Sequence, residues 1–347
     1  MDETDQELLT TVRKNCEISD ARHAGDYSLC IYLLKMRELY RWEKKLAMGE
    51  PIEQKEIGVW MGQREQLWET LEDVEYLDLK LVGNAYNPFD QDAINQLLLP
   101  KGLVYGSGYG RFSKPYFFLA RLLRQENPET YRILITGTEY AREISAPPAI
   151  SAGNTLFIRR ESLRRMVWEM VEEWRWQKRQ NAMSRVLDCY EQDLNTAVER
   201  ITDNEIETLI LHEIGERIAG ELIGEDWKKI LATTSCTITE IMVRAVRDNL
   251  ADCLSLLPGL LSEKNEPSLH FYFANLNSLR KDLFPALYQG YQSWLNGEGY
   301  NQLTKVVCAG KNHWLSVARK IIEQYVRYGD ECLPKINALV TDRTTSL

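Results

Sequence analysis

Hydrophobic residues recur at helical spacing along almost the whole chain, and only the window 101–160 breaks this period. In that window glycines, aromatic residues and β-branched residues replace the helical pattern. The apolar run Tyr116–Leu123 and the segments 131–136 and 155–160 are typical of strands separated by turn residues. The pattern therefore predicts a mainly α, multi-helix globular protein with a small antiparallel β-sheet of about three strands near residues 101–160.

This change of pattern divides the chain into three regions. Residues 1–100 form an N-terminal helical region, residues 101–160 form the small sheet, and residues 161–347 form a C-terminal helical region. No stretch rich in glycine, serine or proline separates these regions. The sheet can therefore be an insertion in one helical body, and the three regions can form one compact unit.

Capping residues mark where two of the helices begin. Thr202 with Glu205, and Thr237 with Glu240, have the spacing of capping boxes, in which two side chains satisfy each other's free backbone donors. These pairs predict helices that run to about residues 223 and 256. We expect further helices over 27–48, 56–79, 90–100, 161–201, 267–282, 285–296 and 300–328.

Composition and charge exclude several classes of protein. A hydrophobic content of 44% and an aromatic content of 10% exclude intrinsic disorder. The net charge of -9 gives no overall attraction for nucleic acid or for an anionic membrane, so neither is expected as a partner. No apolar run approaches the roughly 20 residues of a membrane-spanning helix, and the acidic N-terminus lacks the apolar core of a signal peptide. The 7 scattered cysteines, none in CxxC spacing, predict a cytoplasmic protein.

One short segment contains a histidine and two glutamates, which are side chains that can bind a metal ion or act in catalysis. Residues 209–216 read Leu-Ile-Leu-His-Glu-Ile-Gly-Glu, and the first capping box places them on a helix. His212 and Glu216 are one helical turn apart and share a face, with Glu213 beside it. Apolar residues surround them, so we expect His212 to be mostly buried. The charged groups then need compensation from arginine, hydrogen bonds or a metal ion.

This segment resembles the active-site helix of the zincin metallopeptidases, in which an apolar triplet precedes His-Glu-x-x-His. In that family two histidines bind zinc and the glutamate activates the bound water. Here Glu216 replaces the second histidine, and a carboxylate also suits iron or manganese. The resemblance implies one divalent ion (Zn, Fe or Mn) held by His212 and Glu216, with Glu213 as the general base.

A metal ion at this helix needs a third ligand. The helix expected after Thr237 offers Glu240, Asp248 and Asp252, but Glu240 already has a capping role. Asp252 lies among apolar neighbours and is the first choice, with Asp248 as the substitute. Arg244 stands four residues before Asp248, so a simple ion pair on the helix surface is an alternative.

These residues predict a metal-dependent hydrolase-like protein that acts on a small-molecule or peptide substrate. A first alternative is a non-catalytic helical scaffold or partner-binding protein. In that case His212 and Glu216 form a buried polar network with an arginine such as Arg217 or Arg244. Metal content separates the two hypotheses.

A second alternative is a carboxylate-bridged di-metal oxidase-like protein. Glu17, Asp20 and His23 are spaced by three residues, as in carboxylate-bridged metal proteins, and Glu38 or Glu65 would complete such a site. The boundary that Gly25 and Asp26 suggest instead makes His23 a loop or capping residue.

Two further patterns are weaker. Arg159, Arg160 and Arg164 lie at the expected junction of a strand and a helix, where guanidinium groups suit an anionic ligand. Pairing with glutamates at helical spacing is the alternative.

The segment 106–110 has three alternating glycines and resembles a phosphate loop only superficially, because no Lys-Ser/Thr follows. It predicts a glycine-rich hairpin turn.

Overall fold

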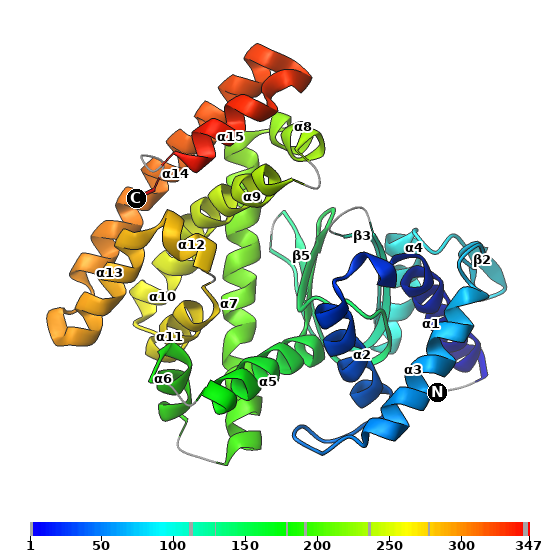
Figure 1. Cartoon of the computed structure of the whole chain (residues 1–347). Coiled ribbons are helices and arrows are strands. Elements are labelled where there is room, and N and C mark those ends of the chain that lie inside the picture. The colour runs from blue at the N-terminus through cyan, green and yellow to red at the C-terminus, as the bar shows by residue number, and fades with distance from the viewer. Residues whose placement is uncertain are drawn as a thin grey trace. The chain divides into compact units, whose positions relative to one another are not determined.

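A computed structural model describes residues 3–110, 114–128, 130–177, 180–190, 193–234, 237–276, 278–342 and 346–347. Helix accounts for 68% of the chain, which confirms a mainly α protein (Figure 1). The chain divides into two compact units. Unit 1 comprises residues 1–170 and 194–202, and unit 2 comprises residues 171–193 and 203–347. None of the helices in the described ranges has both the length and the hydropathy that a membrane crossing requires.

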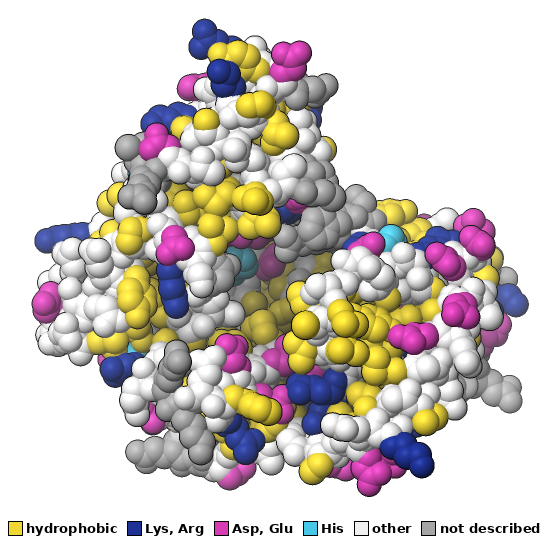
Figure 2. Space-filling model, viewed as in Figure 1, with side chains coloured by type: hydrophobic (Ala, Val, Ile, Leu, Met, Phe, Trp, Pro, Cys, Tyr) yellow, Lys and Arg dark blue, Asp and Glu magenta, His cyan; other side chains and the backbone are white. Residues whose placement is uncertain are grey.

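Unit 1 combines helices with two sheets. Its helices are α1 (Glu3–His23), η1 (Ala24–Asp26), α2 (Leu29–Lys44), α3 (Gln54–Glu69), α4 (Gln91–Leu98), η2 (Leu99–Lys101) and the first part of α5 (Arg160–Gln177). Its strands are β1 (Leu79–Leu81), β2 (Asn84–Tyr86), β3 (Leu103–Tyr109), β4 (Pro115–Glu126), β5 (Arg132–Arg142), β6 (Ala149–Ala152) and β7 (Thr155–Arg159). Hydrophobic side chains gather on the outer surface of α2 (Figure 2).

The larger sheet has five strands among the described residues, in the order β3-β4-β5-β7-β6, so the prediction of about three was too low. β5 and β7 pair in parallel, which makes the sheet mixed rather than antiparallel. Alternate residues of β4 enter two cores. Phe117 and Leu119 join the core that includes residues of α1, whereas Tyr116 and Phe118 join a second core. Burial of both faces explains why β4 begins as an uninterrupted apolar run.

The glycine-rich segment 106–110 begins inside a strand, which corrects the predicted hairpin turn. Gly106 lies in β3 and pairs with Phe118 of β4. A Cβ atom at Gly106 would lie 2.0 Å from the Phe118 ring, so the aromatic side chain occupies the space that a side chain there would need. Beyond β3 the Gly110 amide donates to the Lys114 carbonyl at 2.8 Å. Gly106 therefore serves the close packing of β3 against β4.

Two expected helices end or divide differently in the structure. The helix expected over 56–79 ends at Glu69, and residues 79–86 form the β1–β2 hairpin. The region 161–201 contains α5, α6 (Ala182–Asp188) and the beginning of α7 (Leu194–Ile223). At residues 79–86 strand pairing overrides the local helical pattern.

One of the two capping predictions is wrong, and the other is confirmed for the Thr237 side chain. Thr202 lies inside α7, where its hydroxyl donates to the Val198 carbonyl at 2.7 Å, so it begins no helix. Thr237 caps α9 (Ile238–Ala251), because its side chain accepts a hydrogen bond from the backbone N–H of Glu240 at 3.2 Å.

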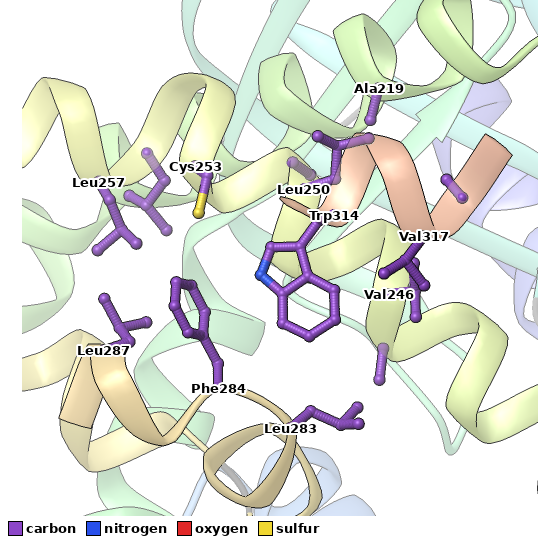
Figure 3. Packing of buried hydrophobic residues seen from close by; sticks show 14 of the residues in the cluster. Ala219, Val246, Leu250, Cys253, Leu257, Leu283, Phe284, Leu287, Trp314 and Val317 are labelled. Carbon is purple, nitrogen blue, oxygen red and sulfur yellow. The ribbon is translucent and has the colours of Figure 1, made fainter. Parts of the chain in front are cut away.

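Every described element of unit 2 is helical. Besides α6, α9 and parts of α5 and α7, it contains α8 (Asp226–Thr233), η4 (Asp252–Leu256), α10 (Leu257–Glu263), α11 (Glu266–Asn275), α12 (Ser278–Leu283), α13 (Pro285–Ser293), η5 (Trp294–Glu298), α14 (Asn301–Tyr328), η6 (Gly329–Cys332) and α15 (Leu333–Thr341). Trp314 of α14 is fully buried in its core, between Leu250 and Val246 of α9 and the ring of Phe284 (Figure 3).

We expect Gly106→Ala to destabilise unit 1, because overpacking a filled core costs about 1–3 kcal/mol. Gly58→Ala is the matched control. Gly58 is an exposed helical glycine with nothing within 4 Å of an added Cβ, so alanine there is neutral or stabilising. Urea denaturation followed by circular dichroism measures both free energies of unfolding. Equal values for the two variants would contradict the packing argument.

Candidate functional site

The predicted active-site helix makes a close backbone contact with a second segment of unit 2. Gly215 lies on α7 between Glu213 and Glu216, and a Cβ atom there would lie 2.3 Å from the carbonyl oxygen of Ala251. Ala251 ends α9, and the π-helical turn η4 begins at the next residue, Asp252. Such π-turns are frequent at functional sites because they redirect one side chain. The close approach therefore brings Asp252 to His212.

His212 lies between two carboxylates. Its Nδ1 atom is 2.8 Å from Oδ1 of Asp252, and its Nε2 atom is 3.5 Å from Oε1 of Glu216. Burial disfavours the imidazolium, but the charge of Asp252 and the hydrogen bonds to both carboxylates outweigh it and raise the pKa of His212 well above its ordinary value. The ring is mostly buried, as the sequence predicts, with 26% of its side chain exposed.

Asp252 is the buried acid of this cluster, with 1% of its side chain exposed. Arg280 of α12 donates a hydrogen bond to Oδ2 of Asp252 and another to the Asn249 side chain at 2.9 Å. Burial alone would raise the pKa of Asp252, but the charges of Arg280 and His212 hold it well below its usual range. Asp252 is therefore an anion with a cation at each oxygen.

Glu216 has the same arrangement in a more exposed position. Arg247 of α9 donates to Oε2 of Glu216 at 3.0 Å, while His212 faces Oε1. Burial raises the pKa of Glu216, but the His212 hydrogen bond and the Arg247 charge outweigh it, so the pKa is lowered. Arg217 and Arg244, which the sequence suggested as partners, pair instead with Glu221 and Glu240.

Glu213 stands at the edge of the network. It makes no hydrogen bond or ion pair with the described residues, and burial followed by the charge of Glu216 raises its pKa to about 7. Asp248, the substitute ligand, lies 3.7 Å from Arg247 and also has a raised pKa, through burial and the charge of Glu216. These two carboxyls are the groups of the cluster that take up a proton most readily.

This arrangement does not form a metal ligand set. A divalent ion needs a ring nitrogen and carboxylate oxygens that converge on one point. Here Asp252 and Glu216 lie at opposite nitrogens of one imidazole, and a protonated imidazole has no lone pair to give. Across the described ranges no group of three or more His, Cys, Asp or Glu side chains is arranged to hold a metal ion. Glu216 and Asp252 each contact His212 but do not meet at one common point, and a bound metal stays a prediction.

The residues of the second alternative site have separate partners in unit 1. Glu17 accepts hydrogen bonds from Arg64 and Trp68. Asp20 is buried and accepts from the Ile144 amide at 3.0 Å. His23 pairs with Asp26 at 3.3 Å, at the end of α1. Glu38 pairs with Arg37 and Arg41, and Glu65 accepts from the Tyr32 hydroxyl.

The three arginines of the predicted anion site all contact glutamates. Arg159 is completely buried, and it pairs with Glu139 at 2.7 Å and with Glu143 at 3.0 Å. Arg160 and Arg164 both pair with Glu199 of α7. This pairing favours the structural interpretation of the cluster, although the glutamates are not the ones that helical spacing suggests.

Sequence reasoning missed a cavity of about 490 Å³ in unit 1. Residues of α1, η1, α2, α3 and the turn after α3 line it, and they include the aromatic residues Tyr27, Tyr32 and Trp68 and the acids Glu65, Glu69 and Glu72. The signal was present in the sequence, because the three acids and Trp68 keep three- and four-residue spacing. What the spacing did not reveal was that this face of α3 stays open.

The charge pattern at His212 predicts a measurable titration. Asp252→Asn removes the anion that raises the pKa of His212, so the pKa should fall. NMR titration of the ring protons measures this, and the 4 histidines of the chain are few enough to assign with a His212→Gln variant. An unchanged pKa of His212 in Asp252→Asn would contradict the assigned pairing.

The same pair sets a pH window of stability. The raised pKa of His212 contributes stability that is complete below 6.5 and is lost as pH rises through the folded-state value. The lowered pKa of Asp252 contributes stability that is complete above 3.8 and is lost as pH falls through its folded-state value. The difference in the free energy of unfolding between wild type and Asp252→Asn should therefore be largest between pH 3.8 and pH 6.5.

Comparison with known proteins identifies the family to which the chain belongs. No solved structure matches the chain. The model of the N-terminal domain of a family of unknown function (DUF6866) matches residues 7–159, and the model of the C-terminal domain of the same family matches residues 164–343. The two matches meet at the start of α5 and together cover both the larger sheet and the His212 cluster. The chain therefore belongs to the DUF6866 family.

Proposed function

We propose that the protein is a non-catalytic helical scaffold or partner-binding protein, in which the His212 network fixes the helices of unit 2. The observation that carries this proposal is the position of the imidazole between Asp252 and Glu216. The second oxygen of each carboxylate is bonded to an arginine, Arg280 or Arg247. Each charged group of the network is thus paired with an opposite charge of the same chain, which supports a structural role for the network.

The network joins elements that are distant in the sequence. His212 and Glu216 lie on α7, Arg247 on α9, Asp252 on η4 and Arg280 on α12. Removing one partner of a buried charge pair typically costs about 3–5 kcal/mol, because the remaining charge is left without compensation. A buried pair of this kind also disfavours other helix registers, which suits a scaffold that presents a fixed surface.

A metal-dependent hydrolase is the competing proposal. It is supported by the contacts of Glu216 and Asp252 with His212, and by the pKa of about 7 at Glu213, which suits a general base at neutral pH. For this function His212 must lose its proton and the carboxylates must leave their arginines. Those steps oppose metal binding, and the scaffold is therefore the proposal that we favour.

The proposal includes a cytoplasmic location and no nucleic-acid partner. The scattered cysteines without CxxC spacing support the location. The net charge of -9 supports the absence of a polyanionic partner.

Thermal unfolding with and without EDTA separates the two functions. For the scaffold we expect His212→Ala to lower the stability by about 3 kcal/mol, because Asp252 loses one of its cations. Glu213→Gln should change it by less than about 1 kcal/mol, because Glu213 bonds to no described residue. EDTA should shift none of the melting temperatures.

The competing function gives another pattern in the same experiment. A bound metal stabilises only the folded state, so EDTA would lower the melting temperature of the wild type and leave His212→Ala unchanged. Elemental analysis of untagged protein that was never exposed to chelator provides an independent measurement. About one ion per chain, lost in Glu216→Ala, would contradict the scaffold.

A further inference from the structure

The beginning of α2 exposes large hydrophobic side chains. Leu29, Ile31, Leu33 and Leu34 have between 45% and 70% of their surface exposed. Leu29 and Leu33 lie one turn apart on one side of the helix, and we refer to these two residues as the α2 face, whereas Ile31 and Leu34 lie on the other side. Hydrophobic side chains gather over α2 in Figure 2, with acidic side chains beside them along α3. A contiguous apolar surface rimmed by polar residues is typical of an interaction site.

The α2 face adjoins the cavity between α1, α2 and α3. Leu29 belongs to both, and Tyr32, which lies on the same helix between residues of the face, also lines the cavity. At about 490 Å³ the cavity is large enough for a long side chain. A ligand on the α2 face therefore reaches the cavity with a neighbouring group.

The cavity wall contributed by α3 is negatively charged. Glu65 and Glu69 lie on successive turns of α3, Glu72 lies in the turn that follows, and all three are exposed. Glu65 also accepts a hydrogen bond from the Tyr32 hydroxyl at 2.8 Å. Within the described ranges no cation pairs with these three side chains, whereas Arg64 already pairs with Glu17 and Glu43. The wall therefore favours a positively charged group.

Aromatic rings from α3 and from the region of α2 also line the cavity. Trp68 and Tyr32 line the cavity beside the glutamates, and a cation over such a ring is stabilised by the negative face of the π system. Tyr27 is already in contact with cations of the chain, since Lys114 and Lys35 lie 4.4 Å and 5.3 Å from its ring centroid. A further cation therefore fits the Trp68 end of the cavity.

We propose that this surface binds a basic amphipathic helix of a partner protein. Its apolar side chains pack on the α2 face, and one of its arginine or lysine side chains enters the cavity beside Glu65, Glu69 and Trp68. A second copy of this chain fits poorly, because each copy carries a net charge of -9. A free amine would leave the α2 face uncovered. The surface lies in unit 1, so its test is independent of the His212 network.

Fluorescence anisotropy with the full-length protein tests the proposal. The probe is a fluorescein-labelled peptide that has leucines at helical three- and four-residue spacing and arginines between them. We expect binding that weakens with salt. The affinity should fall by at least about tenfold in the triple variant Glu65→Gln/Glu69→Gln/Glu72→Gln. Replacing the arginines of the peptide by neutral citrulline should cause a similar loss.

Two variants complete the design. The triple variant Glu53→Gln/Glu75→Gln/Asp78→Asn makes the same change in net charge at exposed positions outside the cavity, and it should bind as the wild type does. Leu29→Ser/Leu33→Ser changes only exposed positions, so its melting temperature should be unchanged while its affinity falls.

Several results would overturn the proposal. Equal losses in the two triple variants would mean general electrostatic attraction without a site. Displacement of the peptide by n-butylguanidinium at equal affinity would assign the cavity to a small cation. Dimerisation that Leu29→Ser/Leu33→Ser abolishes would assign the α2 face to a second copy. Absence of peptide binding at about 1 mM would exclude the docking site.

Discussion

The buried carboxylate of Asp252 is the constraint on which the organisation of unit 2 depends. A charge with 1% exposure is tolerated only where cations compensate it. Arg280 and His212 supply them from two other helices, and His212 in turn attracts Glu216, which Arg247 holds. Four further side chains are thus paired, directly or through a neighbour, with this one buried charge: Arg280, His212, Glu216 and Arg247. The same principle operates in unit 1, where Arg159 lies between Glu139 and Glu143.

Much of this organisation could be predicted from local patterns. Helical periodicity identified a mainly α protein, and Thr237 marked the beginning of α9. One-turn spacing put His212 and Glu216 on a common face, and apolar neighbours identified Asp252 as the buried acid that contacts His212. In each case the signal lay within a few residues of the position concerned.

The remaining features depend on contacts that no local pattern contains. Arg280 reaches Asp252 from a different helix, so the identity of the compensating cation follows only from tertiary packing. Thr202 has the sequence context of a cap, but its hydroxyl bonds inside α7. Gly106 suggested a turn because its real partner, the Phe118 ring, belongs to the next strand. A metal motif and an ion-pair network also use the same residue types. The sequence does not show whether both nitrogens of the His212 imidazole face carboxylates, as they do here.

Gly215 has a consequence for electrostatics as well as for packing. Its missing Cβ lets α7 approach the Ala251 carbonyl, and the 2.8 Å contact between His212 and Asp252 depends on that approach. A larger residue would move the two backbones apart, and the attraction between opposite charges weakens with distance, more steeply when water enters the gap. The basicity of the His212 imidazole therefore depends on a residue that has no side chain.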